Sequence, residues 1–425
     1  MSAPLPSDYL PKSDIVYNSQ KRTWYTRDPS GKWININEDS VKRRLVAAGF
    51  TRDRMPGGSL MEKEISRIQD EQNVSYVGPL AGWPVGIHKH SDDKFLVTKA
   101  ARPLTTKDTQ CDILLKILTS ALGGEPQFEW FKCFMQTRRE AVRNRVFVPG
   151  PIVILVGPAK SYKSFIQLLI TELLGGRQAR PWRYMSGQTT FNGDLFGAEH
   201  LCIEDEAPPT DSATQTKIGS HIKSLLFADN LSAHFKGCDA IYLKPIWTMS
   251  MSTNDEPSNL LCIPPIDESL EDKIALLKTK CIDSPWADEN HKQTWMREHL
   301  LEEVLGLAHI IDQQVIRPEW RNDRTIINAY KNSDLLQMIN NVSPEEQLLN
   351  MINVITNGTM IKGTAVEIDL RTRVRFSRQT EKIADTHWKT GVLLGKLAKK
   401  HPGRVTRKTI RGSTVWTILP PLNRA

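Results

Sequence analysis

Residues 151–164 read PIVILVGPAKSYKS, and this stretch predicts the fold of the chain. The aliphatic run 152–156 is typical of a buried strand, and it leads into a short loop that begins at Gly157 and ends at Lys163 and Ser164. The next residues, FIQLLITELLGG, have the apolar spacing of a helix and end in two glycines. A strand, a tight loop and a helix in this order are typical of a P-loop, whose backbone N–H groups hold phosphates.

The loop departs from the P-loop pattern at one position. The pattern G-x-x-x-x-G-K-[ST] requires glycine before the lysine, and Tyr162 stands there instead. Glycine permits a backbone conformation that side chains disfavour and lets a phosphate approach closely. Tyr162 therefore either turns its ring outward or weakens the site. Lys160 adds positive charge inside the loop, which favours phosphate binding. The expected nucleotide-binding residues are Gly157, Pro158, Ala159, Lys160, Ser161, Tyr162, Lys163 and Ser164.

Two later segments supply the other groups that phosphoryl transfer needs, so we expect ATP and Mg²⁺ as cofactors. AEHLCIEDEAPP (198–209) is an apolar strand that ends in acidic residues. We expect Asp205 and Ser164 to hold Mg²⁺, with Asp205 acting through water, and Glu206 to orient or deprotonate the attacking water. An acidic surface turn is the simpler interpretation, but the preceding P-loop disfavours it.

LKPIWTMSMSTNDEP (243–257) is a strand ending at Asn254, the position of a γ-phosphate sensor. The expected catalytic residues are Lys163, Asp205, Glu206 and Asn254.

The composition is that of an ordinary globular protein with an uneven charge. Hydrophobic residues make up 40% and charged residues 24% of the 425 residues. No apolar run is long enough for a membrane helix, and the six widely spaced cysteines favour a reducing cytoplasm over a zinc or disulfide framework. The net charge is +8, but residues 359–425 carry 15 Lys and Arg against 4 Asp and Glu. This segment predicts a nucleic-acid surface, with a solvated basic tail as the alternative.

The basic segment has the pattern of a small DNA-binding domain. SRQTEKIADTHWKT and GVLLGKLAKKH predict two short helices, and RVTRKTIRGSTVWTIL predicts a hairpin. Two helices followed by a basic hairpin are typical of a winged helix, in which we expect Trp388 and Trp416 to be core residues. Its charges suit phosphate contacts, so binding should be sensitive to salt and weakly sequence-specific. The expected DNA contacts are Lys396, Lys399 and Lys400 on the second helix and Arg404, Arg407, Lys408 and Arg411 on the hairpin.

The rest of the chain predicts a multidomain α/β protein. Residues 14–36 indicate a hairpin around a D-P-S-G turn, and SVKRRLVAAG and LMEKEISRIQDEQN indicate helices. IKSLLFADNLSAHFKGCDAIYL predicts a helix and a hairpin whose tip, Lys236-Gly237, is either a DNA-tracking finger or an ordinary turn. The expected units are an α+β docking domain (1–107), a helical collar (108–145), a P-loop ATPase core (146–283), a helical region (284–357) and a winged helix (358–425).

Together these motifs resemble the superfamily 3 helicases of phages, plasmids and large DNA viruses, in particular the phage and plasmid primase-helicase branch. The resemblance spans residues 10–420 and rests on GPAKSYKS, FNGDLFGAEHLCIEDEA, AHFKG, SMSTND and IPPIDESLEDKIALLKT. It implies an AAA+-like ATPase that assembles as a hexameric ring around DNA in the cytoplasm of a host cell. It also implies that His234, Lys236 and Gly237 form the DNA-contacting hairpin and that Asn254 is the sensor.

The resemblance fails at the arginine finger. The family usually places this arginine soon after the sensor strand, where this chain reads ESLEDKI with Lys273 as the nearby cation. Arg321 or Arg324 is an alternative finger, and a missing finger implies a slow ATPase. The N-terminal residues contain no primase-type acidic constellation, so a primase or polymerase partner should be a separate chain.

Three hypotheses follow from the sequence. The first is an ATP-driven replicative helicase or translocase acting on single-stranded or forked DNA. The second is a DNA-binding replication initiator or loader whose P-loop binds nucleotide with weak or no turnover, for which Tyr162 and the missing finger argue. The third is an NTPase of a virus or mobile element that acts on RNA.

Overall fold

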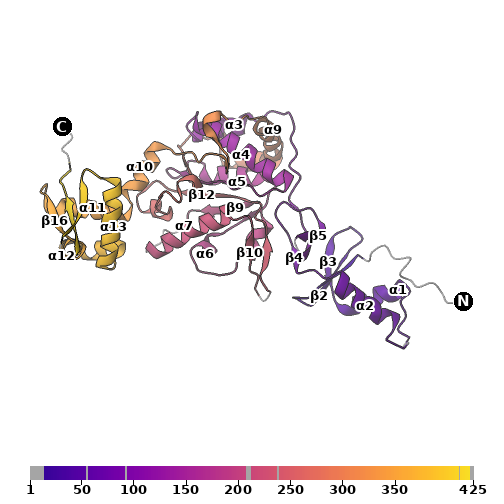
Figure 1. Cartoon of the computed structure of the whole chain (residues 1–425). Coiled ribbons are helices and arrows are strands. Elements are labelled where there is room, and N and C mark those ends of the chain that lie inside the picture. Colours follow the sequence, from indigo (N-terminus) through magenta and orange to yellow (C-terminus); the bar gives the residue numbers. More distant parts are fainter. Residues whose placement is uncertain are drawn as a thin grey trace.

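The computed structural model describes residues 14–53, 56–90, 93–206, 212–236, 239–410 and 412–421. Figure 1 shows three parts in chain order: an N-terminal α+β unit, a central α/β unit and a small C-terminal unit. Within these residues, no helix combines the length and the apolar composition that crossing a membrane requires. The same residues contain no group of three or more His, Cys, Asp or Glu side chains arranged to hold a metal ion by themselves.

An antiparallel sheet and two helices form the N-terminal unit. Its elements are β1 (Ile15–Asn18), β2 (Thr23–Arg27), β3 (Trp33–Ile36), α1 (Glu38–Ala47) and α2 (Leu60–Glu71). β2 and β3 form the predicted hairpin, in which Gly31 has φ +82°, and β1 pairs with β2 as a third strand. Side chains cap both helices, because Asn37 accepts from the backbone N of Ser40 and Ser59 forms a capping box with Glu62. Both predicted helices are confirmed.

A second small sheet joins the N-terminal unit to the central unit. It contains β4 (Tyr76–Gly78), β5 (Gly86–His90) and β6 (Asp93–Val97) in the order β4-β6-β5. Phe95 of β6 lies in the same hydrophobic cluster as residues of the central sheet. The fully buried Glu199 accepts hydrogen bonds from the backbone N of Gly82 at 2.8 Å and from Nε of Arg177 at 2.9 Å. This sheet therefore packs with the central unit.

Five parallel strands form the central sheet, which confirms the predicted α/β core. They are β7 (Ile152–Val156), β8 (Gln178–Ala179), β9 (His200–Glu204), β12 (Thr248–Thr253) and β13 (Ile274–Lys278), in the order β13-β7-β12-β9-β8. Val156 at the end of β7 pairs with Thr253 and Lys278, so the carboxyl ends of neighbouring strands meet at one edge. Ligands of open α/β sheets bind at this edge. The segments that follow β7, β9 and β12 all leave the sheet there.

Helices cover both faces of the central sheet. They are α3 (Asp112–Ala121), α4 (Gln127–Asn144), α5 (Lys163–Leu173), α6 (Trp182–Met185), α7 (Ser212–Phe227), α8 (Glu289–Glu298) and α9 (Leu300–Asp312). Val153 and Leu155 of β7 face a core shared with α3, α4, α5 and α9, whereas the alternate residues of β7 face a core shared with α7. Arg139 of α4, only 1% exposed, pairs with Asp312 at 2.8 Å and thereby ties α4 to α9.

Short elements connect the sheet to its surroundings. They are β10 (Leu231–Ala233) and β11 (Ile241–Leu243), β14 (Arg321–Asn322) and β15 (Ile326–Ile327), α10 (Ser333–Asn341), and 3-10 helices at Gly193–Gly197, Asn259–Cys262, Glu271–Lys273 and Pro318–Trp320. β10 and β11 pair as the predicted hairpin. Leu335 and Ile339 of α10 pack into the central core, so α10 belongs to the central unit.

The C-terminal unit has its own core. It contains α11 (Pro344–Thr356), β16 (Ile361–Thr364), α12 (Ala365–Ile383), α13 (His387–Lys400), β17 (Val405–Ile410) and β18 (Ser413–Ile418), with strand order β16-β18-β17. Leu348 of α11 packs with Ile368, Leu394 and Trp416 in one cluster. Because α11 contributes to this cluster, the packed unit begins before residue 358. The sequence predicts the winged helix to begin at that residue.

The expected helix boundary at Gly391 is wrong. α12 ends at Ile383, and α13 begins after Thr386, whose side chain accepts from the backbone N of Lys389. Gly391 lies inside α13, where a Cβ would stand 3.4 Å from the Cβ of Ala365. The glycine therefore permits close packing of α12 against α13 and does not end a helix. The sequence interpretation also missed the first part of α12, which starts at Ala365.

Candidate functional site

The loop between β7 and α5 wraps around the side chain of Lys163. Its Nζ donates to the carbonyl oxygens of Gly157 and Pro158 at 2.8 Å each and to Oδ1 of Asn254 at 2.9 Å. Lys163 is 6% exposed, and burial lowers its pKa. Gly157 permits this tight path, because a Cβ there would lie 2.3 Å from the carbonyl oxygen of Thr279. Lys163 is thus held against the loop and against the end of β12.

Tyr162 adopts the backbone conformation that glycine would provide. Its φ of 61° and ψ of 15° are left-handed, and Lys160 in the same loop has φ 64°. A left-handed backbone costs an L-residue roughly 1–2 kcal/mol. The Tyr162 ring extends away from Lys163 and packs near Phe165, with centroids 6.1 Å apart, and near Trp286 at 6.4 Å. The backbone at position 162 is therefore left-handed, a conformation open to glycine, although tyrosine stands there.

The acidic segment after β9 contributes one residue to the site. Asp205 lines the same cavity as Lys163 and Ser164, and Ser164 is an exposed residue in the otherwise buried first turn of α5. Glu206 does not line this cavity. Its backbone carbonyl accepts from the Cys262 thiol at 3.2 Å, and burial raises the pKa of its side chain. Glu206 therefore lies beside the site, and Asp205 faces into it.

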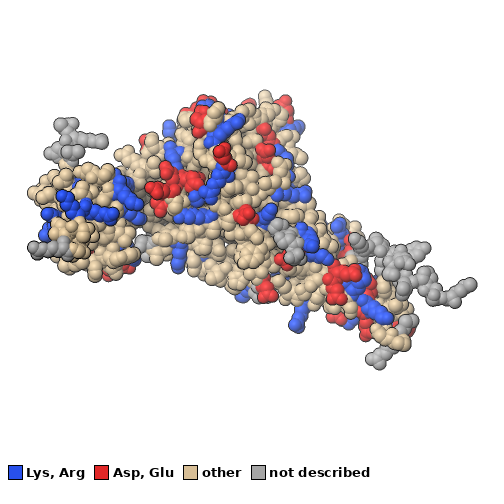
Figure 2. All heavy atoms as spheres, viewed as in Figure 1, with Lys and Arg blue, Asp and Glu red and all other residues tan. Residues whose placement is uncertain are grey.

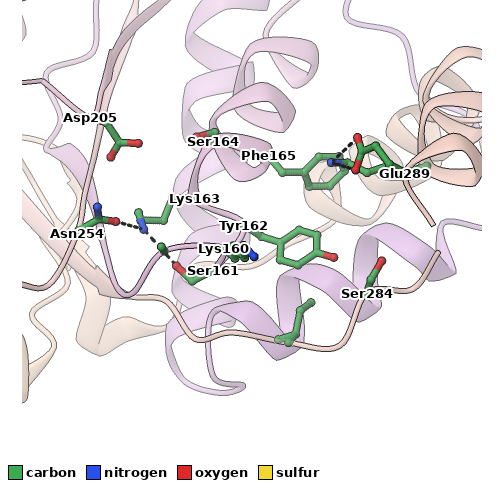
Figure 3. A pocket seen from close by; sticks show the side chains of 13 residues that line it. Lys160, Ser161, Tyr162, Lys163, Ser164, Phe165, Asp205, Asn254, Ser284 and Glu289 are labelled. Carbon is green, nitrogen blue, oxygen red and sulfur yellow. Dashed lines mark hydrogen bonds and ion pairs between the residues drawn. The ribbon is translucent and has the colours of Figure 1, made fainter. Parts of the chain in front are cut away.

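These residues surround a cavity of about 630 Å³ at the carboxyl edge of the sheet (Figure 3). It is lined by Ala159, Lys160, Ser161, Tyr162, Lys163, Ser164, Phe165, Asp205, Asn254, Ile282, Ser284, Glu289 and Lys292. The structure thus brings together Lys163, Ser164, Asp205 and Asn254, which the sequence singled out separately. Sequence reasoning missed the wall formed by residues 282–292. The pairing of β13 with β7 places that wall beside the loop, and no local motif marks it.

A buried polar network holds the three site-bearing elements together. Gln167 of α5 donates to the carbonyl oxygen of Ile203 in β9 at 3.0 Å and to Oγ of Ser250 in β12 at 2.9 Å. His200 of β9 bonds Ser250 at 2.8 Å and Thr171 of α5 at 2.7 Å. Burial lowers the pKa of His200 to about 3, so the ring is neutral near pH 7. The network links the helix of Lys163 to the strands of Asp205 and Asn254.

The candidate finger residues lie outside the cavity. Lys273 contacts Asp272 at 2.5 Å, and its Nζ lies over the Phe227 ring at 4.6 Å. Arg324 lies 3.6 Å from Asp272 and 4.9 Å from the same ring. Lys273 precedes Ile274, which pairs with Ile152 at the amino end of β7. These two cations are therefore at the opposite end of the sheet from the P-loop of their own chain.

Arg321, the third candidate finger, is exposed. Its Nε lies 3.4 Å from the carbonyl oxygen of Ile316, and it does not join the cluster around Asp272.

The segment that follows β10 in the β10–β11 hairpin contacts Asn192 and Tyr76. The backbone N of His234 donates to Oδ1 of Asn192 at 2.7 Å, and the Phe235 ring stacks on Tyr76 with centroids 4.8 Å apart. Lys236 is exposed beyond this anchor. Gly237 lies outside the described residues. The described part of the hairpin is thus braced against the β4–β6 sheet.

The predicted DNA contacts of the C-terminal unit fall into two groups. Lys400 pairs with Glu346 at 3.1 Å, and Arg404 donates to the carbonyl oxygen of Leu419 at 3.0 Å, so both are engaged within this unit. The second group is exposed, on α13 and on β17, in a region where Figure 2 shows Lys and Arg at the surface: Lys396, Lys399, Arg407 and Lys408. Arg411 lies outside the described residues.

The interpretation of Trp388 as a core residue is wrong. Trp388 is 72% exposed, whereas Trp416 is buried at 4% as expected. Because α13 begins at His387, Trp388 lies in its first turn on the outer face, and Leu393, Leu394 and Leu397 supply the buried face.

Solved structures share this fold. No protein-family model and no curated protein matches the chain. A structure of JCV helicase aligns with 57% of this chain at a TM-score of 0.26, which is too low to support an argument. Two apo structures of the NrS-1 C-terminal region each give a TM-score of 0.54 at 12% identity. They cover 98% and 99% of this chain and 99% and 100% of their own. The chain therefore shares the fold of that region over nearly its whole length.

Proposed function

We propose that this protein is an ATP-dependent DNA helicase or translocase of a phage or mobile element, which hydrolyses ATP in a ring around DNA. The observation that carries the proposal is the meeting of Lys163, Ser164, Asp205 and Asn254 at one cavity. They come from three separate segments and supply the cation, hydroxyl, carboxylate and amide that phosphoryl transfer uses. The motif resemblance to superfamily 3 helicases supports the helicase class.

Lys163 would bind the β- and γ-phosphate oxygens. Within the described residues, its hydrogen-bond acceptors are neutral oxygens, and its ammonium group is largely removed from water. Desolvation disfavours the charged form, and a neighbouring anion favours it. Phosphate would therefore be a better partner for this ammonium group than the carbonyl oxygens and Asn254. Asn254, once released, would contact the γ-phosphate.

Ser164 and Asp205 would hold Mg²⁺. Both present hard oxygen atoms, and Figure 3 shows them on the same side of the cavity as Lys163 and Asn254. Mg²⁺ at phosphate sites keeps several waters and takes further ligands from the phosphates, so a hydroxyl and a carboxylate suffice from the protein. When bound, the ion would neutralise charge on the phosphates.

Glu206 would orient or deprotonate the attacking water. Burial raises the pKa of its carboxyl group, and a higher pKa makes the carboxylate a stronger base. Because Glu206 does not line the cavity here, this role requires its side chain to turn toward Asp205 when nucleotide binds.

The C-terminal unit would bind DNA through phosphates. Its order of helix, strand, two helices and two strands is that of a winged helix, and Lys396, Lys399, Arg407 and Lys408 are exposed on it. The β10–β11 hairpin would track single-stranded or forked DNA inside a hexameric ring. In that ring, Lys273 or Arg324 would act on the site of a neighbouring subunit, because both lie far from their own P-loop along β7. A primase or polymerase on another chain is a further proposed partner.

DNA-stimulated ATPase activity tests the proposal. We expect wild-type protein to hydrolyse ATP faster with single-stranded or forked DNA and Lys163→Ala to lose this activity. Equal rates for the two proteins would overturn the proposal. Competition between single-stranded DNA and RNA of the same sequence tests whether RNA is the substrate instead.

The second candidate is a replication initiator or loader that binds DNA and nucleotide with weak or no hydrolysis. Two observations favour it: Tyr162 replaces the P-loop glycine, and none of the described residues that line the cavity is an arginine. Tight binding of a fluorescent ATP analogue without DNA-stimulated turnover would favour this function over the helicase.

A further inference from the structure

The cavity has a second half that the proposed hydrolysis does not use. Figure 3 shows Asp205 and Asn254 on one side of Lys163, and Tyr162, Ser284 and Glu289 on the other. Tyr162, Phe165, Ser284 and Glu289 lie on this second side in Figure 3, and Ile282 and Lys292 also line the cavity. The cavity of about 630 Å³ is within the usual range of roughly 300–1,000 Å³ for small-molecule sites. The phosphate side therefore continues into an aromatic and polar compartment.

Tyr162 occupies this compartment in an unfavourable backbone conformation. At φ 61° glycine would be unstrained, whereas a bulky residue at positive φ is an outlier. Such conformations persist where the surrounding structure holds them, and they gather at ligand sites. Here the half-buried ring is held by Phe165 and Trp286 and still lines the cavity. The position that usually carries no side chain thus contributes an aromatic wall.

The polar side of the compartment comes from the first turn of α8. Glu289 and Lys292 lie 3.3 Å apart, and their side chains are 66% and 35% exposed. A carboxylate accepts hydrogen bonds from an amino group, and an ammonium group donates to a ring nitrogen or a carbonyl oxygen. The two side chains therefore match the donors and acceptors at the edge of an aminopurine.

We propose that this second half is the nucleobase subsite, that Tyr162 is its stacking platform and that Glu289 recognises the amino group of a purine. This inference rests on the proposed nucleotide binding and adds the base-recognition residues to it. Tyr162 is then a specificity residue whose ring contributes affinity for the base.

Inorganic tripolyphosphate carries the three phosphates of ATP without the base. A comparison of its binding with that of ATP therefore isolates the contribution of the base. Calorimetry with Mg²⁺ would compare ATP and tripolyphosphate binding to wild type, Tyr162→Gly and Tyr162→Trp. Tyr162→Gly restores the P-loop pattern and removes strain, so it should fold. Stacking on an aromatic side chain contributes enough that its loss should weaken ATP binding about tenfold. Tripolyphosphate affinity should not fall, and Tyr162→Trp should keep ATP affinity near the wild-type value.

Three other results of the calorimetry would contradict the proposal. If Tyr162→Gly binds ATP as tightly as wild type or more tightly, Tyr162 is no platform and the inference is wrong. If both ligands weaken equally, the ring supports the loop alone, which also overturns the inference. If wild-type protein binds neither ligand, the proposed nucleotide binding itself fails.

A second comparison tests Glu289. Inosine triphosphate has a carbonyl oxygen where ATP has its amino group, so the affinity ratio of the two reports amino-group recognition. We expect wild type to prefer ATP and Glu289→Ala to lose most of that preference. Glu298→Ala, an exposed change at the other end of α8, is the matched control. An unchanged ratio in Glu289→Ala would overturn the assignment of Glu289.

Discussion

Nζ of Lys163 lies 2.9 Å from Oδ1 of Asn254, although 91 positions separate the two residues in the chain. The bond joins the first residue of α5 to the residue after β12, and both side chains line the cavity. A ligand that attracts the lysine must therefore also change the environment of the asparagine. If Lys163 binds phosphate as proposed, the two side chains link that binding to the end of the adjacent strand.

Lys163→Ala should abolish most of the ATPase activity. The substitution removes the cation that we propose binds the phosphates, and loss of one such charge-stabilising group typically lowers kcat by about a hundredfold or more. Steady-state phosphate release with single-stranded DNA measures the effect. Lys116→Ala, an exposed change on α3, should retain wild-type activity. Retained activity in Lys163→Ala would argue that the cavity is not the hydrolytic site.

Asn254→Ala should separate binding from turnover. Removal of the amide frees Lys163 for phosphate, so the Kd for ATP should stay within about threefold of wild type while kcat falls by about a hundredfold. Binding of a fluorescent ATP analogue and single-turnover hydrolysis give the two quantities independently. A parallel loss in both would show that Asn254 mainly shapes the loop and has no sensing role.

Gln167→Leu should destabilise the protein by about 1–3 kcal/mol. Its amide donates to the carbonyl oxygen of Ile203 and to Ser250 in a buried setting, and the loss of two buried hydrogen bonds costs free energy of this size. Urea unfolding of the central unit measures the change. The exposed Gln293→Leu on α8 is the control and should shift the free energy of unfolding by less than about 0.5 kcal/mol. Equal effects of the two changes would contradict the importance of the network.

Acid should destabilise the fold in part through His200. Burial lowers its folded pKa to about 3, whereas an unfolded histidine titrates near about 6.5. Between these values the unfolded chain binds more protons, so stability falls as the pH drops below about 6.5 toward about 3. At pH 5 this contribution is about 2 kcal/mol.

His200→Gln should therefore show a shallower fall of Tm between pH 7 and pH 5 than wild type does. His387→Gln, an exposed substitution at the start of α13, should keep the wild-type slope. Identical slopes in all three proteins would mean that His200 is not buried in its neutral form.

Arg407→Ala combined with Lys408→Ala should weaken DNA binding without changing sequence preference. Removal of each cation that binds a phosphate should reduce the steepness of log K against log salt by about 1. Fluorescence anisotropy at several salt concentrations measures both affinity and slope. Arg43→Ala with Arg44→Ala, an exposed pair on α1, should leave both values unchanged. An unchanged slope in the Arg407 and Lys408 variant would exclude the β17 strand from the DNA surface.

The sequence by itself determined the local elements. Residues 151–174 predict a strand, a loop and a helix because aliphatic β-branched residues, glycine and helical spacing act over short distances, and the structure has these elements. Local patterns are misleading where packing between helices decides where a helix begins or which side chains are buried. Gly391, where the sequence predicts a helix to begin, lies inside α13 close to Ala365, and Trp388, expected in the core, lies on the surface.

Only the tertiary structure decided which of the expected residues line the cavity and which other residues join them. The pairing of β7 with β13 brings the 282–292 wall to the loop, and no residue near that wall in the chain indicates this proximity. The direction of the Tyr162 ring was also decided by packing, because Phe165 and Trp286 hold it along the cavity wall. The sequence determines what each segment can form, and the order of strands in the sheet determines which side chains meet.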